Sequence, residues 1–166
     1  MDEKYLQELE NTQDLADIFE LVKDSVEKTF RMHRAGLTLG LVELGGSNAG
    51  FLGGYHTIGT NIIIMNSTPL QRIKKTKPEF LKPYTFVVLA HEYLHTLGVL
   101  DELQVRKFVH SLCRKIFGEE HITTQMALDL RQFIPYLTYK FDFPINENMP
   151  IKVVDKFDRS SLTYIK

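Results

Sequence analysis

The stretch VVLAHEYLHTLGVLDE, residues Val87 to Glu102, decides how the chain can fold. From Tyr84 to Leu97 the sequence is apolar on nearly every side, which is typical of a helix buried in the middle of a domain. His91 and His95 are four residues apart, so on a helix they lie on one face and can present two imidazoles to one ion. We therefore predict a buried central helix that carries two metal ligands.

Composition limits what else the chain can be. With 166 residues and 43% hydrophobic content, residues 1–166 fit one globular domain. No apolar run approaches the length of a membrane crossing, and the N-terminal residues are acidic and polar, so we expect a cytoplasmic protein without a membrane partner. The single cysteine, Cys113, excludes an internal disulfide and a cysteine-based zinc cluster. Any metal site must use histidines and carboxylates.

Charge gives no sign of a nucleic-acid partner. The 20 Lys+Arg residues nearly balance 21 Asp+Glu residues, so the chain lacks a global basic footprint. The one notable basic cluster, RIKKTK at Arg72–Lys77, reads as a solvated helix face before a loop. We expect a peptide or protein partner and no nucleic acid.

Around the central helix the pattern predicts an α+β fold with a small, mostly antiparallel sheet. Apolar residues at helical spacing predict an N-terminal helix from Asn11 to His33. Alternation and β-branched residues predict a strand at Gly36–Leu44 and one or two short strands within Phe51–Asn66, with a turn near Gly59. We further expect a short helix with Pro69 at its first position, a helix from Asp101 to Phe117, another that begins near Thr123 and breaks at Pro135, and a short strand at Ile151–Val154.

The histidine pair also predicts a reaction. A catalytic zinc ion has three protein ligands and an open position for water, whose pKa it lowers toward about 7. Glu92, directly after His91, is placed to take a proton from that water as the water attacks a carbonyl carbon. A purely structural zinc site has no use for such a base.

The third ligand is open between several carboxylates. If the helix continued straight past His95, residue 101 would lie about 9 Å further along its axis, too far to share the ion. Gly98 can adopt the left-handed conformation that ends a helix and turns the chain back. We favour Asp101, although it also fits a helix cap with Gln104 in the sequence DELQ.

The alternatives to Asp101 are Glu102, which would begin the next helix if Asp101 only caps it, and the more distant carboxylates Glu119 and Glu120.

The remaining histidines are not spaced as metal ligands and are expected on the surface or as helix caps: His33, His56, His110 and His121. Among these, His56 precedes the motif helix on a strand segment and could reach a substrate oxyanion.

The sequence HEYLHTLGVLD resembles the extended zincin signature H-E-x-x-H-x-x-G-x-x-H/D of metzincin metallopeptidases, with aspartate in the third place as in the snapalysin type. This resemblance implies a zincin-like fold, Zn²⁺ held by His91, His95 and Asp101, and Glu92 as general base. It also implies a strand edge around Asn61–Met65 along which a peptide could lie extended.

Two details bear on the clan. Metzincins have a methionine turn beneath the metal, for which Met149 lies in turn-like sequence while Met126 reads as helix core. The chain also resembles minimal archaeal-type gluzincins, whose third ligand is a glutamate on the following helix. That resemblance favours Glu102 or Glu119.

The predicted function is a zinc-dependent metallopeptidase. One alternative is another zinc hydrolase, because bacterial RNA-processing zinc enzymes have a similar spacing; those enzymes carry glycine at the position of Glu92 and histidine at that of Asp101. A second alternative is a non-catalytic module that zinc stabilises and that binds partners. The presence of Glu92 favours the peptidase.

Overall fold

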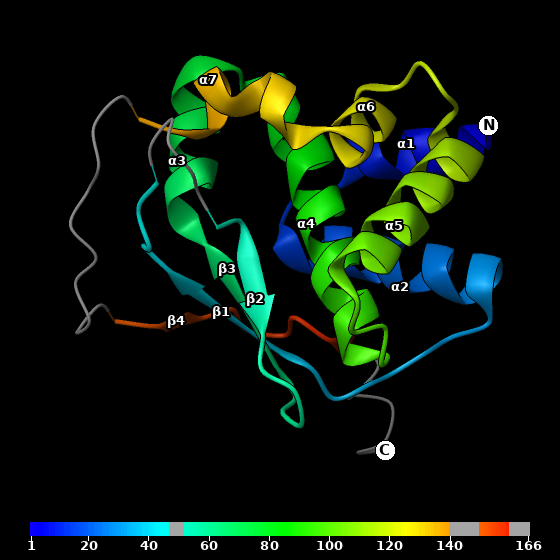
Figure 1. Cartoon of the computed structure of the whole chain (residues 1–166), viewed down its shortest axis with the longest axis horizontal. Coiled ribbons are helices and arrows are strands. Elements are labelled where there is room, and N and C mark those ends of the chain that lie inside the picture. The colour runs from blue at the N-terminus through cyan, green and yellow to red at the C-terminus, as the bar shows by residue number, and fades with distance from the viewer. Residues whose placement is uncertain (47–51, 140–149, 160–166) are drawn as a thin grey trace.

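A computed structural model describes residues 1–46, 52–139 and 150–159 of the chain. In these residues the fold is α+β, as predicted, with helices packed beside a mixed four-stranded sheet. Figure 1 shows helix α4 (Leu81–Thr96) in the middle of the molecule, with the strands on one side and helices α5 (Glu102–Phe117) and α6 (Ile122–Leu128) on the other. The element that carries HEYLH is thus central, as its apolar sequence predicts.

The N-terminal region forms two helices where the sequence predicted one. These are α1 (Glu3–Asn11) and α2 (Leu15–Phe30). Asp14 divides them, because its side chain accepts a hydrogen bond from the amide of Asp17 and begins α2. Helix α2 ends at Phe30, and the capping residue Arg31 after it has a left-handed φ of 59°. The predicted helix from Asn11 to His33 was therefore wrong at both ends.

The sheet has the strand order β2-β3-β1-β4. Its strands are β1 (Thr38–Val42), β2 (Gly54–His56), β3 (Ile62–Asn66) and β4 (Lys152–Val153). Strand β3 pairs parallel with β1 and antiparallel with β2, and β4 pairs antiparallel with β1. Two of the three pairings are thus antiparallel. The turn between β2 and β3 contains Gly59, with a φ of 84°, where the sequence predicted a turn.

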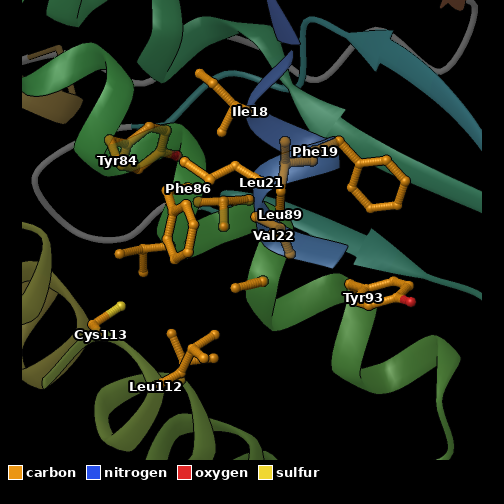
Figure 2. Close-up of a cluster of buried hydrophobic side chains, with 14 of the residues drawn as sticks. Ile18, Phe19, Leu21, Val22, Tyr84, Phe86, Leu89, Tyr93, Leu112 and Cys113 are labelled. Atoms are coloured by element: carbon orange, nitrogen blue, oxygen red, sulfur yellow. The ribbon is translucent and has the colours of Figure 1, made fainter. Parts of the chain in front are cut away.

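Helix α4 is held in the core by apolar side chains along its length. Its buried residues contact α2 and α5 (Glu102–Phe117), and Figure 2 shows Phe19 and Val22 of α2, Phe86 and Leu89 of α4, and Leu112 of α5 in one cluster. Tyr93 packs edge-on against Phe19 with ring centroids 5.4 Å apart. This packing fixes the position of α4, and with it the direction in which its polar side chains point.

The remaining helices and turns precede α4 or follow α5 along the chain. Helix α3 (Ser67–Thr76) and a 3₁₀ turn (Pro78–Phe80) precede α4. After α5 come α6 (Ile122–Leu128), a 3₁₀ turn (Leu130–Phe133) and α7 (Ile134–Leu137). The break that the sequence placed at Pro135 falls earlier, at Asp129, where the backbone is extended.

Among the described residues, no helix combines the length and apolar character that a membrane crossing requires.

Candidate metal centre

The end of α4 turns the chain back as Gly98 predicts. Gly98 has a φ of 96°, its amide donates to the carbonyl of His95, and the amide of Val99 donates to the carbonyl of Leu94. This pair of hydrogen bonds is the Schellman ending of a helix, which a glycine in the left-handed region allows without strain. The turn brings the first residue of α5, Glu102, back beside the two histidines.

The side chains of His91, His95 and Glu102 converge on one point. Nε2 of His95 lies 2.8 Å from one carboxylate oxygen of Glu102, and Nε2 of His91 lies 3.1 Å from the other. The two Nε2 atoms are 3.2 Å apart. Three donors about 2.1 Å from a common tetrahedral centre lie roughly 3.4 Å from one another, so the observed spacing is close to that of a zinc ligand set.

The hydrogen bonding of His95 supports a cation in this position. Its Nδ1 donates to the carbonyl of Val99 at 2.8 Å, so in the neutral ring the lone pair is on Nε2. That lone pair faces the Glu102 carboxylate and the Nε2 of His91. A positive charge between these groups would stabilise this arrangement, and one divalent cation can accept an electron pair from each of the three. The donor set therefore fits a metal ion.

Asp101, the favoured third ligand, lies outside this cluster. Its carboxylate accepts a hydrogen bond of 2.8 Å from the amide of Gln104 and caps α5. Glu102, the alternative, is the residue that the structure brings to His91 and His95. Glu119, a more distant candidate, pairs with Arg114 at the other end of α5. Asp101 thus performs the capping role that the DELQ sequence offered.

Glu92 lies beside the cluster as the motif predicts. Glu92 is 5% exposed, and its Oε2 has no hydrogen-bond partner among the described residues. Burial, with a smaller contribution from Glu102, raises the pKa of Glu92 to about 8. Burial likewise lowers the pKa of His91, against the opposing effect of Glu102. A carboxyl group with a pKa near neutrality can both accept and return a proton.

These groups line a cleft of about 1170 Å³. One wall consists of strand β2 and its flanks, residues 52–56 and 58, and the other of α5 and residues 126–131. His56 lies in the first wall, where its Nδ1 donates to the carbonyl of Ile62 at 3.0 Å. Arg106, one turn after Glu102, lies in the second.

Two glycines that sequence reasoning passed over place β2 against the motif helix. A Cβ at Gly54 would lie 2.7 Å from the carbonyl oxygen of Ile64 and 3.4 Å from Cγ of Glu92, and one at Gly53 would lie 3.1 Å from the Tyr84 hydroxyl. At Gly54 only glycine allows so close an approach, and at Gly53 a larger residue would force its neighbours to shift. A Gly-Gly pair inside a strand pattern was the available signal.

The other sequence-predicted residues lie away from the cluster or beyond the described residues. His121 caps α6 by accepting from the amide of Thr123, and His33 lies 3.8 Å from Glu27. Met126 is buried in the core, although it also borders the cleft. Met149, the candidate for a methionine turn, lies outside the described residues.

Comparison of the chain with protein-family models, with curated proteins and with solved structures found no match.

Proposed function

We propose that this protein is a zinc-dependent metallopeptidase in which His91, His95 and Glu102 hold the ion and Glu92 is the general base. The observation that carries the proposal is the convergence of three ligand atoms, all within 4.8 Å of one another, beside a buried carboxylate in a cleft. Two imidazoles and one carboxylate form a ligand set that zinc uses in catalytic sites, with room for a water molecule.

The chain's own residues account for the proton transfers. When bound, Zn²⁺ supplies a Lewis acid that polarises the substrate carbonyl and lowers the pKa of a water molecule. Glu92 then accepts a proton from the attacking water and delivers it to the leaving amine nitrogen. Without a cation, burial raises the pKa of the Glu92 carboxyl group to about 8. A cation held by His91, His95 and Glu102 would lower this pKa and favour the carboxylate form that accepts the proton.

A peptide substrate fits the wall opposite α5. The resemblance to metzincins implied an edge along Asn61–Met65, but β3 lies inside the sheet, between β2 and β1. Strand β2 is the edge beside the cleft. An extended peptide can add to such an edge through main-chain hydrogen bonds, which recognise a polypeptide whatever its sequence.

The same features support a zincin-like architecture of the gluzincin kind. A helix precedes the sheet, the edge strand lies beside the HEYLH helix, and Glu102 on the following helix is the carboxylate nearest the histidines. We further propose that the protein acts in the cytoplasm on peptides or proteins, without a nucleic-acid or membrane partner, as its near-neutral charge favours.

A pair of measurements tests the proposal. The zinc content of the wild-type protein and of Glu92→Gln is determined by elemental analysis, and hydrolysis is followed with a mixture of internally quenched peptides. We expect one zinc ion in both proteins and a loss of turnover of about 10²- to 10⁴-fold in Glu92→Gln.

Three outcomes would contradict it. Undiminished hydrolysis by Glu92→Gln would show that Glu92 is not the general base. Bound zinc without any peptide turnover in the wild type would favour a non-catalytic module. Cleavage of RNA in place of peptides, lost in the same variant, would favour the other class of zinc hydrolase.

A further inference from the structure

The rims of the cleft carry an unusual share of the exposed apolar side chains. Ten large apolar residues are exposed in the described part of the chain, and five of them line this one cleft: Leu52, Tyr55, Ile58, Leu100 and Leu128. Exposed apolar residues scattered singly are ordinary, whereas a group around a cleft marks a binding site. Leu52, Tyr55 and Ile58 lie on the β2 side, and the two leucines lie on the opposite side.

The backbone of β2 shows what kind of ligand lies between these rims. The amide of Asn66 donates to the carbonyl of Gly53, and the register pairs Gly54 with Met65 and His56 with Ile63. In an antiparallel pair, hydrogen-bonded and non-bonded residues alternate. The N–H and C=O groups of Gly54 and His56 therefore point away from β3, toward the free edge.

A free edge of this kind is complementary to another polypeptide. Its donors and acceptors alternate with the spacing of an extended chain, which neither a lipid nor a compact small molecule can match. Within the described residues, neither another strand nor a charged side chain of β2 itself covers it. Natural sheets protect edges with charges, prolines or short strands; β2 is short, but the exposed apolar side chains beside its edge favour a binding role.

We propose that the cleft binds extended polypeptide segments that carry apolar side chains on both sides of the bond to be cut, such as those that unfolded proteins expose. The segment pairs with Gly54 and His56, and its side chains contact Leu52 and Ile58 on one rim and Leu100 and Leu128 on the other. This inference rests on the proposed function for the position of the cut, but the binding can be measured without it.

Binding is measured by fluorescence anisotropy on the Glu92→Gln variant, with and without added zinc, so that no peptide is consumed. Three labelled ten-residue peptides with charged ends are compared. The first has a centre of Leu, Val and Phe, the second has Ser, Asn and Gln there, and the third repeats the first with N-methyl groups at alternate amides. We expect the first to bind at least about tenfold more tightly than either of the others.

Substitutions on the second rim locate the binding. Leu100→Asn and Leu128→Asn should each weaken binding of the apolar peptide by about tenfold and leave the polar peptide unchanged. Leu103→Asn is the matched control. Leu103 is exposed to a similar extent as Leu100 (61% and 55%), but it does not line the cleft. All three leucines are on the surface, so the fold should tolerate the changes.

Several results would overturn the inference. These are equal affinity for the apolar and polar peptides, full affinity for the N-methylated peptide, an equal effect of Leu103→Asn, or a dimer in sedimentation that apolar peptide does not dissociate. Tight binding of the apolar peptide without its hydrolysis by the wild-type enzyme would contradict only the proposed function. Equal hydrolysis of the apolar and polar peptides would contradict only the present inference.

Discussion

Two adjacent carboxylates, Asp101 and Glu102, divide two tasks at the scale of single residues. Asp101 has the shorter side chain and accepts the amide of Gln104, which is the geometry of a helix cap. Glu102 has one more methylene group and begins the helix, so its carboxylate reaches His91 and His95. The 62% exposure of the Glu102 side chain leaves it accessible from the cleft.

This division predicts that substitutions at the two positions change the affinity for zinc by different amounts. Glu102→Ala should weaken zinc binding by at least about 100-fold, because Glu102 is the proposed third ligand. Asp101→Asn should bind zinc as the wild type does, because asparagine also caps helices well. Titration with a competing chromophoric chelator measures both affinities.

Asp101→Ala separates capping from coordination. It should cost about 1 kcal/mol of folding stability in urea unfolding while the protein still binds one zinc ion. Loss of zinc from Asp101→Asn, with zinc retained by Glu102→Ala, would restore Asp101 as the ligand and refute the assignment.

At the scale of elements, the site depends on the angle between α4 and α5. Helix α4 ends at Thr96, α5 begins at Glu102, and the Schellman turn at Gly98 joins them. The same turn supplies the Val99 carbonyl that accepts from Nδ1 of His95. One turn therefore both places Glu102 and orients the ring of a histidine.

Gly98→Ala should consequently affect zinc binding as well as stability. A Cβ at a φ of 96° strains the backbone, at a cost of about 1–2 kcal/mol, and a shifted turn moves Glu102 away from the histidines. We expect zinc affinity to fall by about tenfold or more. Urea unfolding of the metal-free protein and chelator competition measure the two effects separately.

Gly36→Ala is the matched control for Gly98→Ala. Gly36 also has a left-handed φ, 81°, and open space where a Cβ would lie, but it precedes β1 and is not part of the centre. It should lose similar stability with unchanged zinc affinity. If both variants bind zinc like the wild type, the turn does not position the ligand.

At the scale of the whole molecule, the last described residues tie the chain together. Asp158 accepts from Nζ of the buried Lys23 at 2.6 Å and from the amide of Leu37 at 2.9 Å. Phe157 stacks on Phe19, with ring centroids 4.0 Å apart. The segment after β4 thus joins α2 to the strand that begins the sheet, and it supports the layer on which α4 packs.

Asp158→Ala should therefore destabilise the protein strongly. It leaves the Lys23 ammonium group buried with less compensation, although Glu20 also lies 2.9 Å from it. We expect a loss of about 3 kcal/mol in the free energy of unfolding, measured in urea. Glu8→Ala, which breaks the exposed pair with Lys4, is the control and should cost less than about 1 kcal/mol. Equal losses of folding stability in the two variants would show that burial does not strengthen the Lys23–Asp158 pair.

The sequence by itself determined what depends on local spacing. The position of the central helix, the shared face of His91 and His95, the placement of Glu92 and the turn at Gly98 all follow from helical periodicity and backbone sterics within about a dozen residues. The α+β class follows in the same way from the alternation of periodic segments.

Only the tertiary structure decided which residues meet across the chain. The approach of Glu102 to both histidines depends on how α5 packs against α4. The identity of the edge strand depends on pairing β3 with β1, because no local pattern records strand order. Helical periodicity depends on residues that are neighbours in sequence. Core packing and strand pairing depend on segments that are far apart in sequence, so one short motif cannot predict them.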